Sequence, residues 1–371
     1  MRYVFASYVY IPEFNRPETW FKRINAYAGI LEALAKTNEV ISIEQIDFEG
    51  RVQNNGIDYH FKRFAASGPR RYFPLQQHKY IKSLKPDVVV IQSLHFPLQV
   101  IQLRLSLGSR VKIIIQNHAE KPFGGLKKWA TKLADRFTDA YLFASREMGL
   151  DWISMSNLSS PKKIHEVMEV SSVFYPINRV EARAKTLVKG SPVFLWVGRL
   201  NDNKDPLNVV KAFLKFSLSS PGATLYMIFH TGELLSEINI LLDAFPNKDV
   251  VKLIGQIPHS DLIYWFNSAD FIVSGSHYEG SGTAICEAMS CGCVPLVTDI
   301  QSFRMITNNG ECGMLYEPGN EQALFNVLMA TSQINVDEKR RLSLTYYRQN
   351  LSFGAIAKQI EEIASGLIEN R

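Results

Sequence analysis

Two glutamates, Glu279 and Glu287, lie eight positions apart across a glycine-bearing loop that runs into a predicted helix, in the stretch EGSGTAICEAMSCGCVP. Buried-strand patterns flank the stretch at 270–274 and 293–297. A helix that begins near Gly282 directs unpaired N–H groups and the positive end of its dipole at a ligand above the sheet. We therefore expect an anionic ligand whose hydroxyl groups, as in a sugar or a ribose, need the carboxylates as acceptors. The alternative is a polar loop followed by an ordinary helical glutamate.

A second polar segment reads GRLNDNKDP and follows a strand pattern at 192–197. Its Asp205 and Pro206 predict the start of a helix, as N-cap and first helical residue. Arg199 and Lys204 are therefore expected at the carboxyl end of a strand, where open α/β sheets bind ligands. An arginine fork with a lysine charge suits a diphosphate leaving group that no metal neutralises, and the chain has no Asp-x-Asp pair. The alternative is a surface arginine and lysine in a polar loop.

Together, the G-R-L-x3-K segment and the E-x7-E segment about eighty residues later resemble the family 4 retaining glycosyltransferases of the GT-B fold, the glycosyl transferases group 1. The resemblance covers most of the C-terminal half, through Gly255, Gln256 and 310–319, and is weaker in the N-terminal half. It implies transfer of a sugar from a nucleotide-diphosphate donor to an acceptor hydroxyl with retention of configuration. It also implies that neither a cofactor nor a metal is required.

The resemblance implies a role for each candidate residue. Arg199 and Lys204 would hold the donor diphosphate, Glu287 the ribose hydroxyls, and Glu279 the transferred sugar. The predicted donor-binding residues are Gly198, Arg199, Lys204, Gln256, Ile257, Glu279, Gly280, Ser281, Gly282, Thr283 and Glu287. Within this set, the glycine-rich N–H groups would line the phosphates and sugar, and main-chain groups near Gln256 and Ile257 would meet the base. The predicted catalytic residues are Arg199, Lys204, Glu279 and His118.

His118 follows the predicted strand at 111–115, in the run Asn117-His118-Ala119-Glu120, and is expected at the mouth of that strand. The family often has a histidine here that contacts the transferred sugar or phosphate. The alternative is a histidine that is hydrogen-bonded within its own loop.

Three segments depart from the family pattern. The first loop, 7–20, contains prolines and no glycine pair, which puts its phosphate and acceptor contacts in doubt. The run 167–171 (VMEVS) stands where Asn-Gly-Val-Asp is common, and 230–233 (HTGE) stands where a Gly-x-Gly turn is common. The donor pocket could therefore be shaped differently.

Length and patterning predict an α/β fold of two Rossmann-like domains with parallel sheets, because 371 residues exceed one ordinary core. We expect an N-terminal acceptor domain at 1–180, a linker around 176–192 and a C-terminal donor domain at 190–345. By the resemblance, the domains face a cleft, and a helical tail at 346–371 crosses back to the first domain. Strands are predicted at 3–6, 40–46, 87–91, 111–115 and 139–144, and near residues 193, 224, 250, 271 and 294.

Charge is divided unevenly, although the net charge is +5. Residues 1–190 contain 28 Lys and Arg against 17 Asp and Glu, and the remainder contains 13 against 19. The basic clusters are Lys62, Arg63, Arg70 and Arg71, and then Lys121, Lys127, Lys128, Lys132 and Arg136, the second group on a predicted helix with Trp129. Such a helix suits an anionic membrane face or an anionic acceptor; the alternative is a solvated surface. Nucleic acid is not expected, because no recognition module appears.

No stretch approaches the roughly 18 apolar residues of a membrane span, and the N-terminus does not resemble a signal peptide. A cytoplasmic protein is expected, peripheral at the inner membrane face if the basic surface binds lipid. The four cysteines contain no C-x-x-C pair and should be small buried residues. The histidines show no metal-ligand spacing.

The expected partners are a nucleotide-sugar donor and a carbohydrate or lipid-linked acceptor, in bacterial polysaccharide or glycolipid synthesis. Two alternatives remain open: a GT-B sugar-nucleotide epimerase, and a non-catalytic homologue that acts as a partner subunit. A dinucleotide dehydrogenase is disfavoured, because no G-x-G-x-x-G follows the first strand.

Overall fold

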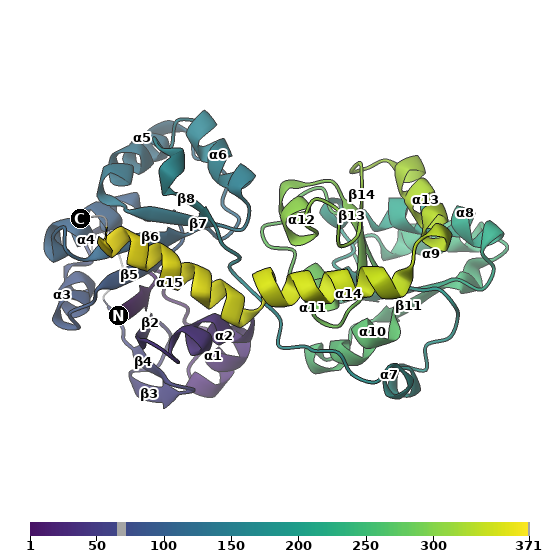
Figure 1. Ribbon diagram of the computed structural model, residues 1–371, viewed down its shortest axis with the longest axis horizontal. Coiled ribbons are helices and arrows are strands. Elements are labelled where there is room, and N and C mark those ends of the chain that lie inside the picture. Colours follow the sequence, from purple (N-terminus) through teal and green to yellow (C-terminus); the bar gives the residue numbers. More distant parts are fainter. Residues whose placement is uncertain (65–71, 370–371) are drawn as a thin grey trace. The chain divides into compact units, whose positions relative to one another are not determined.

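Apolar strand patterns that alternate with amphipathic helices give two separate α/β units in the computed structural model, which describes residues 1–64 and 72–369 (Figure 1). Unit 1 comprises the described residues of Met1–Ser171 and Phe353–Arg371, and unit 2 comprises Ser172–Ser352. Arg70 and Arg71, which belong to the first basic cluster of the sequence, lie outside the described residues.

The sheet of unit 1 has the strand order β3-β4-β2-β1-β5-β6-β7-β8. Its strands are β1 (Arg2–Ala6), β2 (Glu39–Glu44), β3 (Gly50–Asn54), β4 (Ile57–Phe61), β5 (Val88–Gln92), β6 (Lys112–Gln116), β7 (Ala140–Phe143) and β8 (Ile164–Glu166). All neighbours are parallel except β3 and β4, which form an antiparallel hairpin. Asn55 and Gly56 make its turn with φ of 49° and 83°, as a two-residue hairpin turn requires. The sheet is therefore mixed, whereas a purely parallel one was predicted.

Helices cover the sheet of unit 1. They are α1 (Pro17–Arg23), α2 (Asn25–Leu34), α3 (Leu75–Ser83), α4 (Pro97–Leu107), α5 (Gly125–Ala134), α6 (Arg146–Ser154) and α15 (Phe353–Glu369). The last of these packs against α2, where Gly29 leaves space for the ring of Phe353. Its buried residues are Ile356, Ala357, Ile360 and Ala364. The part of the tail that belongs to unit 1 therefore begins at Phe353 rather than at 346.

Unit 2 contains a fully parallel sheet in the order β11-β10-β9-β12-β13-β14. Its strands are β9 (Val193–Gly198), β10 (Thr224–Phe229), β11 (Val251–Gly255), β12 (Phe271–Ser274), β13 (Val294–Thr298) and β14 (Met314–Tyr316). Its helices are α7 (Arg179–Thr186), α8 (Pro206–Ser219), α9 (Leu235–Asp243), α10 (Leu262–Ser268), α11 (Thr283–Ser290), α12 (Gln301–Ile306), α13 (Glu321–Ala330) and α14 (Val336–Tyr346). From β9 the chain adds β10 and β11 on one side of the sheet, and then β12, β13 and β14 on the other side. The carboxyl ends of β9 and β12 therefore form a topological switch point.

The segment predicted as a linker, 176–192, is part of unit 2, and the boundary falls between Ser171 and Ser172. It contains α7, which packs against α10. Arginines of α7 bind the buried carboxylate of Asp270, the residue before β12. The segment is therefore not a flexible linker.

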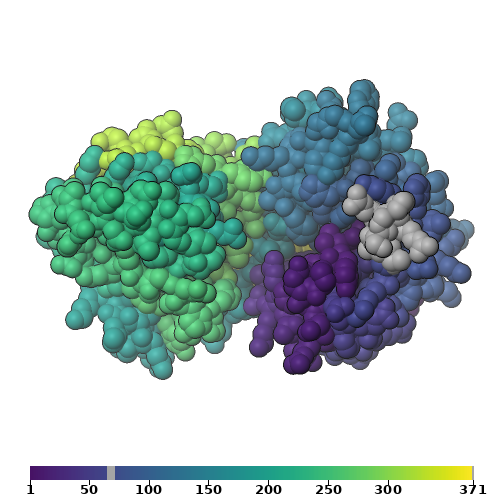
Figure 2. Space-filling model, turned by 180° about the vertical axis from the view of Figure 1, so that it is seen from behind, coloured from purple at the N-terminus to yellow at the C-terminus, as the bar shows by residue number. Residues whose placement is uncertain are grey.

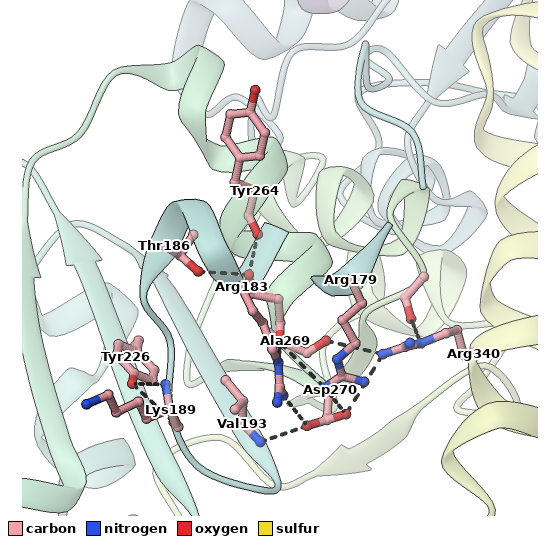
Figure 3. A network of polar contacts seen from close by, with 12 residues as sticks. Arg179, Arg183, Thr186, Lys189, Val193, Tyr226, Tyr264, Ala269, Asp270 and Arg340 are labelled. Carbon is pink, nitrogen blue, oxygen red and sulfur yellow. Dashed lines mark hydrogen bonds and ion pairs between the residues drawn. The ribbon is translucent and has the colours of Figure 1, made fainter. Parts of the chain in front are cut away.

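The carboxylate of Asp270 is shown in Figure 3. Its Oδ1 accepts a hydrogen bond from Arg179 at 2.5 Å, and Arg183 lies 3.7 Å from its Oδ2. Arg340 of α14 lies 3.9 Å from Oδ1, and the backbone N–H of Val193 donates to Oδ2 at 2.8 Å. Asp270 therefore joins α7, α14 and the amino ends of β9 and β12.

The four cysteines, Cys286, Cys291, Cys293 and Cys312, are free and buried in unit 2, as predicted. None of the helices in the described ranges is long and apolar enough to cross a membrane.

We predict that Asp270→Ala lowers the free energy of unfolding by about 3 kcal/mol, because it leaves arginines and a backbone N–H without their acceptor. Asp270→Asn keeps an acceptor and should have an intermediate effect. Scanning calorimetry measures both. The control is Asp243→Ala, which breaks an exposed pair with Lys248 and should leave the free energy of unfolding nearly unchanged. Equal losses at Asp270 and Asp243 would contradict the prediction.

Candidate functional site

A pocket of about 550 Å³ opens in unit 2 at the carboxyl ends of β9, β10, β11 and β12, beside the amino end of α11. It therefore lies at the switch point, where ligands bind in open α/β sheets. The predicted residues that line it are Gly198, Arg199, Lys204, Gln256, Ile257, Glu279, Gly282 and Thr283. Gly280, Ser281 and Glu287, also predicted to bind the donor, are not among its lining residues.

The loop after β9 positions the two cationic side chains. Asn201 accepts a hydrogen bond from the N–H of Lys204 at 3.2 Å and so caps the short turn that carries Lys204. Helix α8 begins at Pro206, as predicted, but Asp205 has a left-handed backbone with φ of 45° and makes no capping hydrogen bond. Its carboxylate instead accepts from the Asn208 amide at 2.7 Å.

Arg199 is exposed at the pocket wall. Among residues 1–64 and 72–369, its guanidinium forms no hydrogen bond and no ion pair. The donor fork of Arg199 is therefore available to a ligand, and it can bind two phosphate oxygens at once.

Lys204 and Glu279 form an ion pair across the pocket, between Nζ and Oε1. The hydroxyl of Ser276 also donates to Glu279 Oε1, at 2.6 Å. The two loops are further joined by backbone, because the N–H of His277 donates to the carbonyl of Asn203 at 2.8 Å. The structure thus brings together the two segments that were combined in the sequence analysis.

Gly282 precedes α11 with φ of 54°. A Cβ at this position would lie 2.8 Å from the ring of Phe303, so both conformation and space require glycine. The first N–H groups of α11, at Thr283 and Ala284, lack intrahelical acceptors. Both residues line the pocket, which gives it donors suited to an anion.

Glu287 is buried in α11 and reaches the pocket through another residue. Its Oε1 pairs with Nε2 of His259 at 2.7 Å, and His259 lines the pocket. The hydrogen bond that His259 donates to Glu287 raises the pKa of His259 above its ordinary value. Burial opposes this rise, and the negative charge of Glu287 adds to it. The ring of His259 also lies 5.0 Å from that of Phe174. A ligand that approached Glu287 would therefore meet His259.

His118 lies in a different pocket, of about 500 Å³, within unit 1. Its Nδ1 pairs with Glu169, and its Nε2 is 2.7 Å from Oε1 of Gln92. Burial lowers the pKa of His118, but the hydrogen bond and charge of Glu169 and the charge of Glu120 outweigh this effect, so that the pKa is raised. Its predicted place after a strand is observed, since it follows β6.

Two of the three segments that depart from the family pattern, 7–20 and 167–171, contribute residues to this unit 1 pocket. The first loop contributes Val9, Ile11 and Phe14 to the lining, and α1 contributes Trp20. Glu169, from the unusual run 167–171, closes it beside His118. The glycine-free first loop therefore builds an apolar wall.

Sequence reasoning missed several lining residues, above all His259 and His230. His230 begins the unusual run 230–233, so a signal for it existed. His259 had no such signal beyond its place soon after Gln256, because its partner Glu287 is distant in the sequence.

Across residues 1–64 and 72–369, no group of three His, Cys, Asp or Glu side chains could hold a metal ion. Whether the protein needs a metal stays untested.

Residues 178–348 match the family described as Glycosyl transferases group 1. This range holds every residue of the unit 2 pocket. Unit 2 is a glycosyl transferases group 1 domain. Membership of family 4 and retention of configuration stay predictions.

Several curated relatives that match parts of this chain are glycosyltransferases. D-inositol 3-phosphate glycosyltransferase of Thermobispora bispora is 23% identical over 368 residues, which cover 93% of this chain and 82% of the relative. The enzyme of that name from Streptosporangium roseum is 25% identical over 196 residues, 50% of this chain and 43% of the relative. O-antigen chain mannosyltransferase B of Escherichia coli is 32% identical over 84 residues, 23% of this chain and 22% of that protein. The chain thus spans less than half of two of these relatives.

Solved structures share the fold over the whole chain. A glycosyltransferase of Rickettsia africae has a TM-score of 0.75 at 16% identity and covers 100% of this chain and 99% of its own. HepE of Anabaena, solved in complex with UDP, has a TM-score of 0.72 at 14% identity, with coverage of 99% and 100%. The prediction of a GT-B fold with two α/β domains is confirmed.

We predict that His259→Gln removes part of the pH dependence of stability. Because the folded-state pKa of His259 is raised, its pair with Glu287 contributes fully below about pH 6.5 and is lost as pH rises through the folded-state pKa. The unfolding midpoint of the wild type should therefore fall more steeply across this range than that of the variant. His118, whose folded-state pKa is also raised, is present in both proteins and affects the pH dependence of their stability equally. The difference between the two unfolding curves therefore reports on His259.

The matched control is His230→Gln, which changes a histidine on the same pocket wall. The side chain of His230 forms no ion pair among residues 1–64 and 72–369, so this control replaces a histidine without removing a carboxylate partner. Parallel curves for the wild type and His259→Gln would refute the prediction.

Proposed function

We propose that this chain transfers a sugar from a nucleotide-diphosphate donor to an acceptor hydroxyl with retention of configuration, without a metal. The observation that carries the proposal is that Arg199, whose guanidinium is unpaired among residues 1–64 and 72–369, lines the same pocket as the Lys204–Glu279 pair and the amino end of α11. The lining therefore provides cationic and N–H donors for a diphosphate and a carboxylate for sugar hydroxyls. UDP is the first nucleotide to test, because HepE of Anabaena was solved with UDP.

Catalysis would rest on the leaving group. As the bond between the anomeric carbon and the diphosphate oxygen breaks, Arg199 and Lys204 would stabilise the growing negative charge. The acceptor oxygen would form its bond to the anomeric carbon on the same face, and its proton would pass to the departing diphosphate. No protein nucleophile is needed, so the protein contributes charge and positioning.

The unit 1 pocket would take the acceptor. His118 is oriented by Glu169 and Gln92, and the wall around it is largely aromatic and aliphatic. An acceptor with a carbohydrate group and an apolar face fits such a lining, as in polysaccharide or glycolipid synthesis. The role of His118 as a contact of the transferred sugar remains part of this proposal.

Donor binding is tested by thermal shift with UDP, GDP, ADP and their common sugar conjugates. A ligand at about a hundredfold excess over its Kd, bound to the folded state alone, adds roughly 2.7 kcal/mol of stability. We expect one nucleotide family to shift the wild type and the Arg341→Ala control, which removes an exposed arginine of α14. Arg199→Ala should lose most of this shift. No shift by any nucleotide would favour the non-catalytic alternative.

Turnover tests the chemistry. Arg199→Ala should lower kcat roughly 10²-fold or more, by analogy with loss of one preorganised donor at a developing charge, while Arg341→Ala should keep wild-type turnover. Product analysis by NMR should show a retained anomeric configuration, and a chelator should leave the rate unchanged. Near-normal turnover of a folded Arg199→Ala protein would refute the role of Arg199. Consumption of the donor without any acceptor would support an epimerase.

A further inference from the structure

Helix α5 of unit 1 presents its apolar side to solvent. Leu126, Trp129 and Leu133 are spaced three and four residues apart and are 88%, 67% and 47% exposed. The buried residues of the helix are Thr131 and Ala134. A surface helix ordinarily packs its apolar side on the core. The α5 stripe, which we define as Leu126, Trp129 and Leu133, is thus the reverse of that arrangement.

Positive charge borders the α5 stripe. Lys132 and Arg136 follow Trp129 and Leu133 by three residues each, and both are exposed. The ammonium of Lys132 lies 5.8 Å from the centre of the Trp129 ring. The sequence of α5 contains no acidic residue, and Asp135, which follows it, is buried and pairs with Lys163 at 3.4 Å.

The basic border of the stripe, which we define as Lys128, Lys132 and Arg136, has no acidic partner in the described part of the chain. Among residues 1–64 and 72–369, none of these three side chains forms an ion pair. Helix α4 packs against α5 and also exposes apolar side chains, with Leu98 at 44% and Leu105 at 73%. Both helices fall in the stretch of sequence that is coloured blue on unit 1 in Figure 2.

We propose that the α5 stripe and its basic border dock on an anionic lipid surface. An amphipathic helix with Leu and Trp on one side and Lys and Arg beside them lies in the plane of the membrane interface, with its apolar side among the acyl chains. Tryptophan favours this depth, and the basic side chains reach anionic head groups. A second copy of the chain is a poorer occupant, because pairing two such faces brings their uncompensated basic borders together.

One consequence rests on the proposed function. The loop that leads from β6 to α5 carries His118, which lines the unit 1 pocket. Helix α5 is also tied to the loop after β5, because Lys127 is hydrogen-bonded to His95. An acceptor anchored in the docked lipid surface would therefore be presented near the sheet edge where this pocket opens.

The test is flotation of the full chain with vesicles of phosphatidylcholine mixed with phosphatidylglycerol, and with vesicles of phosphatidylcholine alone. We expect binding to the anionic vesicles, weakened by salt. The triple variant Lys128→Gln, Lys132→Gln, Arg136→Gln should bind about a hundredfold more weakly, at ~1 kcal/mol per basic residue near the surface. The triple variant Leu126→Ser, Trp129→Ser, Leu133→Ser should lose about tenfold or more, because buried CH2 groups contribute ~0.8 kcal/mol each.

Matched controls change the same kinds of residue elsewhere. Leu187→Ser, Leu218→Ser and Ile240→Ser alter exposed apolar residues of unit 2, and Lys36→Gln, Lys185→Gln and Lys211→Gln remove three exposed charges. Both control triples should float as the wild type does. Brominated phosphatidylglycerol should also quench the fluorescence of Trp129, a signal absent from Trp129→Phe.

Three outcomes would overturn the proposal: no flotation of the wild type, equal losses in the α5 and control triples, or concentration-dependent dimers that the α5 substitutions abolish while vesicles bind nothing. Thermal shift by the donor nucleotide should remain unchanged in every α5 variant. Loss of vesicle binding is thereby distinguished from loss of donor binding.

Discussion

The ion-paired carboxylate of Asp270 is the constraint on which the geometry of unit 2 depends. It joins the first residue of β9 to the residue before β12, so that Phe194 pairs with Phe271 and the register of the two strands is fixed. Gly198 and Ser274 at the other ends of these strands line the pocket. A contact at the amino edge of the sheet therefore sets the separation of the loops that bear Arg199 and Glu279 at the carboxyl edge.

Each of the two glutamates singled out in the sequence has a basic partner in the structure. Glu279 is paired with Lys204, and Glu287 with His259. A sugar or ribose that binds these carboxylates must share them with groups already hydrogen-bonded there. The guanidinium of Arg199, in contrast, has no hydrogen-bond or ion-pair partner among residues 1–64 and 72–369. Under the proposed function, the diphosphate is therefore the part of the donor that this pocket is best prepared to bind.

Much of the fold was predictable, because a parallel sheet buried on both faces has strands of continuous apolar residues. The segments around Arg199 and Glu279 were also predictable, since strand, loop and helix signals are local. The β3–β4 hairpin was missed although Asn55-Gly56 is a strong turn signal. The pairing of His259 with Glu287 was beyond sequence reasoning, because it depends on how β11 and α11 lie in the folded sheet. The α7 segment was mistaken for a linker for the same reason: its arginines bind Asp270, far along the chain.

The burial of every native thiol has a practical consequence for spectroscopy. Burial raises the pKa of Cys291 to about 12 and that of Cys312 to about 11, and Cys286 and Cys293 are inaccessible to solvent. Thiolate, the form that reacts with maleimides and nitroxide reagents, is therefore scarce and shielded in the folded chain. A single cysteine introduced at an exposed site would carry the probe alone, with the natural cysteines left in place. Pairs of such probes, one on each unit, could report interdomain distances in solution without a cysteine-free background.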